Sequence, residues 1–138
     1  MNVYLDASVA LRKLQREIGS LASWSQWERA YSSELIRVEV LRAIDRNRLR
    51  GALTDRDVTN LIDRAYAIFD ALEFVALSRS VLDRAAQSFF TPLGTLDALH
   101  LATALRLAEY GGIELTFLTH DTELATAARS MNFNVAGA

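Results

Sequence analysis

The sequence predicts a single α/β domain in which helices cover both faces of a parallel β-sheet. Short β-prone segments alternate with longer helical patterns along the chain, and strands separated by helices normally form a parallel sheet buried on both faces. The chain has 138 residues, a length typical of one domain. Hydrophobic residues make up 51% and charged residues 23%, as in an ordinary globular protein. We therefore treat residues 1–138 as one domain.

The chain opens with a predicted strand. Residues Met1–Leu5 are apolar and β-prone, and the run stops at Asp6, where the pattern indicates a turn into a helix. Residues 20–31 place large apolar side chains at helical spacing, which predicts a helix there. These side chains are Leu21, Trp24, Trp27 and Tyr31.

Cap signals indicate two longer helices in the next part of the chain. Ser33 is a good N-cap for a helix over residues 34–49, which ends at Gly51. Thr54 and Asp57 have the spacing of a capping box and precede a clear amphipathic pattern. A second helix is therefore predicted from this point.

The remaining sequence alternates strand and helix patterns. The helix over residues 96–110 has the strongest signal, and the glycines at 111 and 112 end it. The other predicted elements are a strand over 74–77, a helix over 81–89, a strand over 115–119, a helix over 122–130 and a strand over 133–135.

Composition excludes several classes of protein. The absence of cysteine excludes disulfides, thiolate nucleophiles and cysteine-based zinc sites, and the single lysine lies outside any P-loop motif. The sequence contains no GxGxxG, GxSxG or HExxH motif. No uncharged apolar run approaches the roughly 18–20 residues of a membrane span, and no signal peptide pattern is present. We expect a cytoplasmic protein.

Two acidic residues follow predicted strands. Asp6 comes directly after the first strand and Asp121 comes shortly after the strand over 115–119. Functional groups of open parallel sheets gather at the carboxyl ends of the strands, so both acids are expected at one edge of the sheet. Each could equally be a turn former or a helix cap, because Asp suits both roles.

Two further acids occupy helical positions that face apolar residues. Glu39 shares a stripe with Leu35, Ile36 and Ala43, where a carboxylate is unusual unless it is paired or bound to a metal. It could also pair with Arg42 or Arg46 on a solvated surface. Asp97 lies in a first helical turn, where the helix dipole favours an acid by about 0.3–1 kcal/mol, yet its i+4 and i+7 neighbours are apolar.

Four carboxylates that converge would repel one another unless cations lie among them, and oxygen ligands of this kind select Mg²⁺ or Mn²⁺. The rest of the chain carries 15 basic and 13 acidic side chains, counted from totals of 15 and 17. An acidic metal site in a slightly basic body suits a phosphodiester substrate. Spacing by itself does not establish that the four acids converge.

Four blocks of the sequence resemble PIN-domain ribonucleases, and most closely the VapC toxins of type II toxin–antitoxin modules. The blocks run in family order over nearly the whole chain. They are Val3-Tyr4-Leu5-Asp6-Ala7-Ser8, the segment from Ser33 to Ala43, Leu96-Asp97-Ala98-Leu99-His100-Leu101-Ala102-Thr103-Ala104, and Phe117-Leu118-Thr119-His120-Asp121.

This resemblance implies a three-layer α/β/α fold and a Mg²⁺-dependent endoribonuclease, with Mn²⁺ as a possible substitute. By position, Asp6, Glu39, Asp97 and Asp121 match the acidic quartet that binds the metal, and we expect Asp6 and Asp97 to be the principal ligands. The supporting hydroxyls match Ser8 and Thr119. His120 departs mildly from the family, which often has Tyr or Asn there.

The resemblance also implies partners. We expect RNA as substrate, a homodimer, and a VapB-like antitoxin that lies along an apolar groove near Trp24 and Trp27 and inserts an arginine near Asp6 and Asp97. Two alternatives remain open at this point. One is a non-catalytic PIN-like module that binds RNA or protein. The other is a phosphotransferase with Asp6 as nucleophile, a class that normally has a second Asp where this chain has Ser8.

Three other features have competing interpretations. Segment 37–50 carries a local charge of +3 and could contact RNA phosphates, contact an acidic partner or form a solvated helix face. His100, in an apolar helix, is interpreted as structural. Phe89 and Phe90 could stack on an RNA base, although burial is favoured.

Overall fold

The computed structural model describes residues 1–15, 24 and 26–138, and these residues form a five-stranded parallel sheet. The strand order is β3-β2-β1-β4-β5, and every neighbouring pair is parallel. The strands are β1 (Asn2–Leu5), β2 (Arg29–Ser33), β3 (Glu73–Val75), β4 (Leu115–Leu118) and β5 (Asn134–Ala136). The predicted parallel sheet is confirmed.

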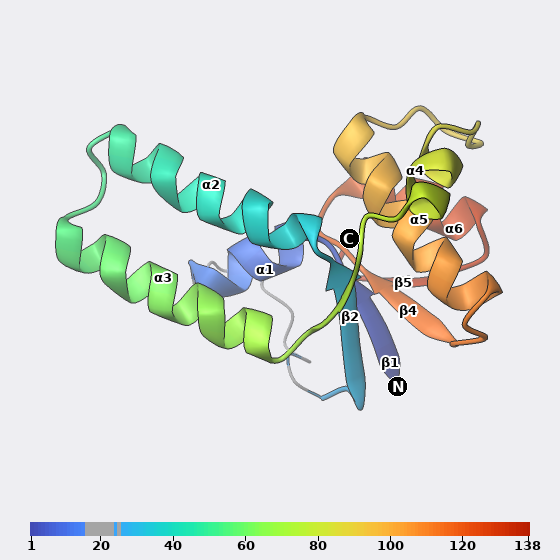
Figure 1. Ribbon diagram of the computed structural model, residues 1–138, viewed down its shortest axis with the longest axis horizontal. Coiled ribbons are helices and arrows are strands. Elements are labelled where there is room, and N and C mark those ends of the chain that lie inside the picture. The colour runs from blue at the N-terminus through green and yellow to red at the C-terminus, as the bar shows by residue number, and fades with distance from the viewer. Residues whose placement is uncertain (16–23, 25) are drawn as a thin grey trace.

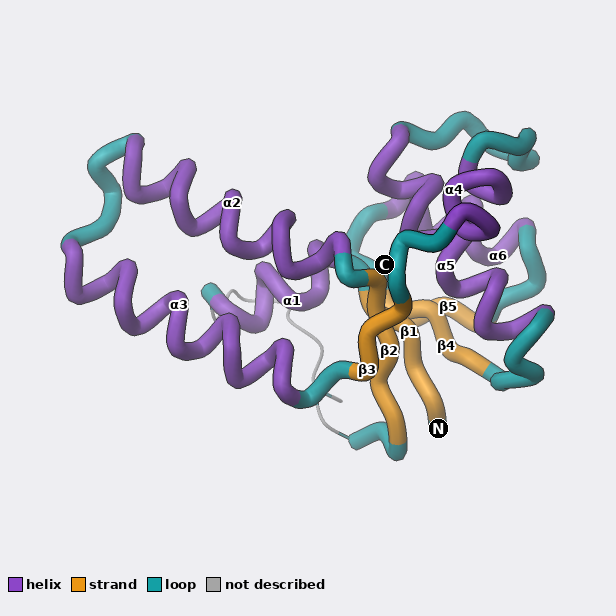
Figure 2. Tube along the Cα trace, in the orientation of Figure 1, coloured by secondary structure: helices purple, strands orange, loops and turns teal. Residues whose placement is uncertain are grey.

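Helices cover both faces of this sheet, as Figures 1 and 2 show. The helices are α1 (Ala7–Leu14), α2 (Leu35–Leu49), α3 (Asp55–Asp70), α4 (Arg79–Ala85), α5 (Thr95–Glu109) and α6 (Thr122–Ser130). α1, α2 and α3 lie on one side, and α2 and α3 form a hairpin that projects beyond the sheet; α4, α5 and α6 lie on the other side. None of the helices in the described residues is long and apolar enough to cross a membrane.

Successive side chains of β1 point to opposite faces of the sheet and pack in two separate hydrophobic cores. Val3 and Leu5 point to the side of α1, α2 and α3, whereas Tyr4 packs with Leu101 of α5 and Phe117 of β4 on the other side. All three β1 side chains are fully buried, as expected for the central strand of a sheet covered on both faces. This arrangement is the predicted three-layer α/β/α fold.

Two of the three cap signals, Thr54 and Gly51, have the predicted effects, whereas the N-cap of α2 is Glu34 and not Ser33 as predicted. Thr54 and Asp57 form a reciprocal capping box at the start of α3. Ser33 Oγ accepts a hydrogen bond from the backbone N–H of Leu35 where α2 begins. Gly51 has a φ of +74°, a left-handed conformation that suits glycine after a helix end.

The helix predicted over residues 20–31 is wrong in its second half, because β2 begins at Arg29. Tyr31 is a buried strand residue, and Trp24 and Trp27 contact each other edge to face, with centroids 5.1 Å apart. Leu21 lies outside the described residues. The strand was missed because two of its buried side chains are serines, which are acceptable inside a protein only with hydrogen-bond partners. Ser32 Oγ donates to the backbone carbonyl of Leu5 at 2.7 Å.

Candidate metal centre at the carboxyl edge of the sheet

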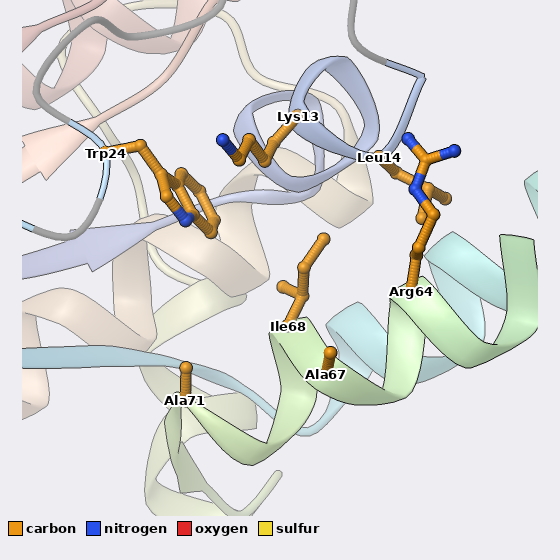
Figure 3. A pocket seen from close by; sticks show the side chains of 7 residues that line it. All are labelled: Lys13, Leu14, Trp24, Arg64, Ala67, Ile68 and Ala71. Atoms are coloured by element: carbon orange, nitrogen blue, oxygen red, sulfur yellow. The ribbon is translucent and has the colours of Figure 1, made fainter.

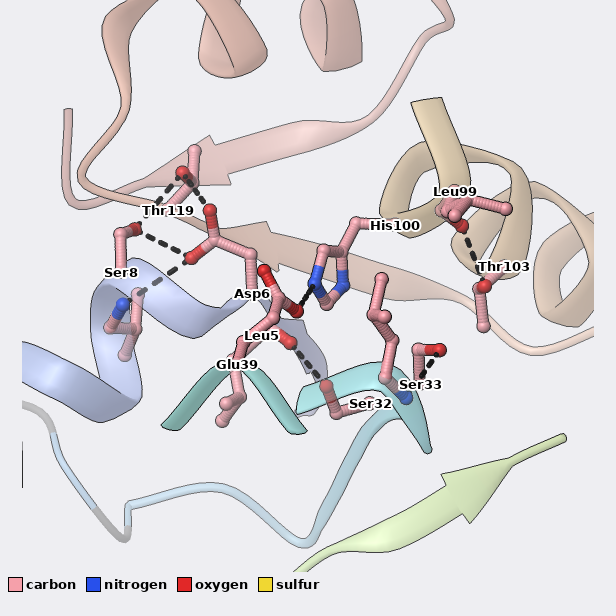
Figure 4. A network of polar contacts seen from close by, with 12 residues as sticks. Leu5, Asp6, Ser8, Ser32, Ser33, Glu39, Leu99, His100, Thr103 and Thr119 are labelled. Carbon is pink, nitrogen blue, oxygen red and sulfur yellow. Dashed lines mark hydrogen bonds and ion pairs between the residues drawn. The ribbon is translucent and has the colours of Figure 1, made fainter. Parts of the chain in front are cut away.

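Asp6 lies where β1 ends and is the N-cap of α1, so its carboxylate is fixed at the edge of the sheet. Ser8 Oγ donates to Oδ1 at 2.6 Å, and Thr119 Oγ1 donates to Oδ2 at 2.7 Å (Figure 4). The backbone N–H of Val9 donates to Oδ1 at 3.3 Å. Burial raises the pKa of Asp6, and the hydrogen bonds from Ser8 and Thr119 oppose that rise.

The two hydroxyls also tie the loop after β4 to the start of α1. Ser8 Oγ accepts from the backbone N–H of His120 at 2.9 Å, and Thr119 Oγ1 accepts from that of Asp121 at 3.0 Å. Asp121 is in turn the N-cap of α6, because its Oδ1 accepts from Leu124 N–H at 3.0 Å. Asp6 and Asp121 therefore lie at the same edge of the sheet, as their positions after two strands predicted.

Glu39 reaches the same region from the second turn of α2. Its side chain is 16% exposed, and Oε1 lies 2.6 Å from Nε2 of His100 on α5. The other ring nitrogen of His100, Nδ1, lies 2.8 Å from the Tyr4 hydroxyl. The alternative of a solvated surface pair between Glu39 and Arg42 or Arg46 is wrong, because the carboxylate of Glu39 pairs with His100 instead. Arg42 pairs with Asp45 at 2.9 Å.

Asp97 lies in the first turn of α5 and is half-buried. Burial, together with the negative charges of Asp121, Asp6 and Glu39, raises the pKa of Asp97 to about 6, while His100 opposes the rise. Asp97 therefore experiences the charge of all three other candidate acids. The four acids, which lie on or at the start of four different helices, gather in one electrostatic environment.

The donor set fits a hard divalent cation. In the positions they occupy, no three acidic or histidine side chains of the described residues come close enough to hold one ion. Two of the candidate ligands have oxygens engaged by other groups, since Asp6 binds two hydroxyls and Glu39 binds His100. The candidate ligands are nevertheless all carboxylates, and a cation of charge +2 would relieve the repulsion that, together with burial, raises the pKa of Asp97.

His100 and Tyr4 are the residues of this site that the sequence interpretation missed. His100 is buried and has a structural setting as predicted, but it contacts a candidate ligand directly. The sequence contained one indication of this contact: His100 follows Asp97 by three residues, which places both side chains on the same face of the helix. The partner Glu39 is 61 residues away in the sequence, so helical spacing could not reveal it.

A basic groove of about 430 Å³ adjoins Ser8 between α1 and α2. Its charged lining consists of Arg12, Arg46 and Arg50. Three arginines of the predicted basic segment do not line this groove. Arg42 and Arg48 both pair with Asp45, and Arg37 lies over aromatic rings of α3 and β3.

A second groove, of about 550 Å³, lies between α1 and α3 (Figure 3). Leu14 and Ile68 contribute apolar surface, Lys13 and Arg64 add positive charge, and Trp24 lies across from Ile68. Lys13 Nζ is 5.5 Å from the centre of the Trp24 ring. Trp24 both lines this groove and packs against the first core, where its side chain is partly buried.

The two adjacent phenylalanines have different environments. Phe89 packs against the second core and lies under Arg84, whose guanidinium is 4.7 Å from the ring centre. Phe90 is 81% exposed, so the expectation of burial is wrong for this residue. It lies in the loop between α4 and α5, where its ring is open to solvent.

A model of the PIN domain matches residues 3–130. The chain belongs to the PIN-domain family. It is 32% identical over 140 aligned residues to Ribonuclease VapC47 of Mycobacterium tuberculosis (strain CDC 1551 / Oshkosh), and the alignment covers 95% of this chain and 93% of that relative. The resemblance inferred from the four sequence blocks is therefore confirmed.

Comparison with solved structures supports the same PIN fold. The chain superposes on a chain from the crystal structure of VapBC2 from Rickettsia felis, bound to a DNA fragment from their promoter, with a TM-score of 0.66. The match covers 99% of this chain and 98% of that chain at 13% sequence identity. At this identity the comparison shows the fold and nothing about residue roles.

Proposed function

We propose that this PIN-domain protein is a Mg²⁺-dependent endoribonuclease and the toxin of a toxin–antitoxin module. The observation that carries the proposal is the edge of the sheet where Thr119 binds both the carboxylate of Asp6 and the backbone N–H of Asp121. The charges of these two acids and of Glu39 add to burial in raising the pKa of Asp97, which supports a shared site. The similarity to Ribonuclease VapC47 supports RNA as the substrate class. The reaction is hydrolysis of an RNA phosphodiester bond.

Each acid has a role in this proposal. Asp6 and Asp97 are the principal metal ligands, and Glu39 and Asp121 are further ligands or position the attacking water. A Mg²⁺ or Mn²⁺ ion held by these acids would supply positive charge for the developing phosphate charge and would lower the pKa of a bound water. Ser8 and Thr119 hold both oxygens of Asp6 by hydrogen bonds, which fixes the direction in which its remaining lone pairs point.

The basic groove beside Ser8 gives the RNA strand a path away from these acids. Its arginines can neutralise the phosphates on one side of the cleaved bond, while the acids with their cation act on the bond itself. The groove begins at Ser8, which donates to Asp6, so a strand in the groove would enter the acidic site directly. This favours the RNA interpretation of the basic segment over a merely solvated helix face.

The apolar groove between α1 and α3 is our candidate surface for a VapB-like antitoxin. Its apolar floor suits one face of an amphipathic segment, and Lys13 and Arg64 suit acidic residues at the edge of that face. An arginine of the same partner would then neutralise the acids near Asp6 and Asp97, because a guanidinium can bind two carboxylate oxygens at once. The similarity in fold to a chain of the R. felis VapBC2 structure supports a partner of this kind.

The catalytic proposal is tested with a circular RNA, which an exonuclease cannot attack. We expect the purified protein to open the circle with Mg²⁺ or Mn²⁺ and not with EDTA. Asp6→Asn should abolish opening, while Asp63→Asn, a change on the exposed surface of α3, should leave it intact. Cleavage that survives EDTA would contradict the metal mechanism. Metal-dependent RNA binding without any product would favour the non-catalytic module, and a phosphorylated Asp6 would favour the phosphotransferase.

The antitoxin proposal is tested by co-expressing the chain with the protein encoded next to its own gene. Ala67→Arg places a long cation on the lining of the groove at an exposed position, so it should weaken complex formation without disturbing the core. Asn60→Arg, two turns earlier on α3 and outside the groove, is the matched control. Equal complex formation by both variants would place the partner elsewhere. Light scattering on the purified protein tests the expected homodimer.

A further inference from the structure

We propose that His100 is a positioning residue for the metal site: it holds one carboxylate oxygen of Glu39 and thereby directs the other toward the cation. This inference rests on the proposed function. Oε1 of Glu39 lies 2.6 Å from His100 Nε2, and Oε2 has no hydrogen bond to any described residue. In Figure 4 the carboxylate of Glu39 lies between His100 and Asp6.

For an ionised Glu39 and a neutral His100, the chemistry of the three groups sets the direction of both hydrogen bonds. An ionised carboxylate has no hydrogen, so His100 Nε2 must be the donor to Glu39, whether the imidazole is neutral or charged. In the neutral ring, Nδ1 is then the acceptor, and the hydroxyl of Tyr4 donates to it at 2.8 Å. Burial raises the pKa of Tyr4, so this hydroxyl keeps its proton.

The imidazole is held rigidly, which makes it an effective anchor. His100 and Tyr4 are almost completely buried. The Tyr4 ring stacks on Phe117 with centroids 5.3 Å apart and meets His100 edge on at 5.9 Å. The ring of His100 is thus fixed by β1 and β4, while the carboxylate that it holds belongs to α2.

Two acids of the site are therefore held in the same way, by hydrogen bonds to neighbouring side chains. Ser8 and Thr119 hold Asp6, and the Tyr4–His100 pair holds Glu39. Groups that hydrogen-bond to metal ligands orient them, and their loss typically weakens metal binding about 10- to 100-fold. Without its anchor, Glu39 would have to give up the freedom of its side-chain torsions each time a cation binds.

Two substitutions of His100 distinguish the roles of its two ring nitrogens. The amide nitrogen of Asn takes the place of Nδ1, whereas the longer Gln places its amide nitrogen near Nε2, where it can still donate to Glu39. We expect His100→Asn to raise the dissociation constant for Mn²⁺, measured by electron paramagnetic resonance without RNA, about tenfold or more. His100→Gln should stay within about threefold of the wild type, because the donor to Glu39 is retained.

Thermal melting without metal controls for folding, since both variants replace the same buried ring and lose similar packing. A double-mutant cycle with Glu39→Gln adds a second criterion: His100→Asn should have little further effect on Mn²⁺ affinity once Glu39 has lost its charge. Equal Mn²⁺ affinities of the Asn and Gln variants, or full additivity in the cycle, would overturn the positioning role. A wild-type protein without Mn²⁺ affinity would overturn it as well.

Failure of the positioning role can be distinguished from failure of the proposed function. If the wild type binds Mn²⁺ but does not open circular RNA, the ribonuclease proposal fails, while the Mn²⁺ affinities still decide the role of His100. If the wild type cleaves RNA and His100→Asn binds Mn²⁺ as tightly as the wild type, only the positioning role fails.

Discussion

Replacing Asp97 by Asn should stabilise the metal-free protein and abolish metal-dependent cleavage. Asn has nearly the shape of Asp and fits a first helical turn, so the substitution removes a charge with little change in packing. In the folded protein that charge is opposed by burial and by the charges of Asp121, Asp6 and Glu39. The substitution therefore removes an unfavourable interaction rather than a favourable one.

The sign and the pH range follow from the pKa. Its folded value of about 6 lies above the ordinary value of 3.8, so the folded state holds the proton of Asp97 more tightly than the unfolded state does. Ionisation of Asp97 thus costs stability progressively as the pH rises from about 4 to about 6, and the full cost is present above that range. The Asn variant has no such cost at any pH.

The magnitude can be bounded. A shift of that size corresponds to about 3 kcal/mol at about 1.4 kcal/mol per unit. Because Asp97 is only partly buried, solvent screens much of this energy, and we expect a gain of about 1 kcal/mol at neutral pH. For a chain of this length such a gain raises the melting temperature by roughly 3–5 °C. A residue that only complements the helix dipole would instead lose about 0.3–1 kcal/mol on the same change.

The assay is thermal unfolding with EDTA, at about pH 7.5 and at about pH 4, together with Mg²⁺ titrations of melting temperature and RNA cleavage. The stabilisation should appear only at the higher pH, and added Mg²⁺ should raise the melting temperature of the wild type and not of the variant. Asp55→Asn, an exposed first-turn acid of α3, is the control for the dipole effect. Destabilisation of Asp97→Asn equal to that of the control, with near wild-type cleavage at limiting Mg²⁺, would refute the reasoning.

Substitutions at three other positions give further expected outcomes. Thr119→Val removes the donor to Asp6 Oδ2 and the acceptor for Asp121 N–H, so urea unfolding should show a loss of about 1–3 kcal/mol. The same change should move the acid limb of the cleavage profile to higher pH, because the pKa of Asp6 loses a hydrogen bond that lowers it. Arg46→Glu should raise KM for long RNA, leave kcat unchanged and weaken the salt dependence of KM; an unchanged salt dependence would remove the groove from the RNA path. Gly51→Ala should cost about 1 kcal/mol in thermal unfolding, since φ is +74° and, its chain neighbours aside, no atom of the described residues lies within 4 Å of the added Cβ, whereas Gly51→Asn should cost less.

Local signals in the sequence were sufficient for most of the fold. The capping box of Thr54 and Asp57 depends on neighbours in the chain, and so does the helix end at Gly51, so both could be predicted without tertiary information. β2 could not be predicted in this way, because its buried Ser32 is satisfied by a carbonyl of β1 that only the folded sheet supplies. Aromatic residues before it happened to have helical spacing, and tertiary packing rather than local periodicity decided the outcome.

The same distinction explains which parts of the site could be predicted. The stripe around Glu39 indicated correctly that its carboxylate needs a partner, but it contained no information that the partner would be a histidine of α5. The positions of Asp6 and Asp121 after strands indicated the shared edge. Ser8 and Thr119 are 111 residues apart in the sequence, yet their hydroxyls meet at that edge. Their contact follows from the topology of the sheet.

The two interpretations first weighed for Asp6 and Asp121, helix cap and functional ligand, are compatible in the structure. Each residue uses Oδ1 to accept a backbone N–H at the start of a helix, which fixes the side-chain torsions as a consequence of folding. A carboxylate that is already fixed by a cap has little freedom left to lose when a cation binds. Glu39 has no cap to hold it, because it lies in the second turn of α2 and has three torsions. On this argument the acid that most needs a dedicated anchor is the one that contacts His100.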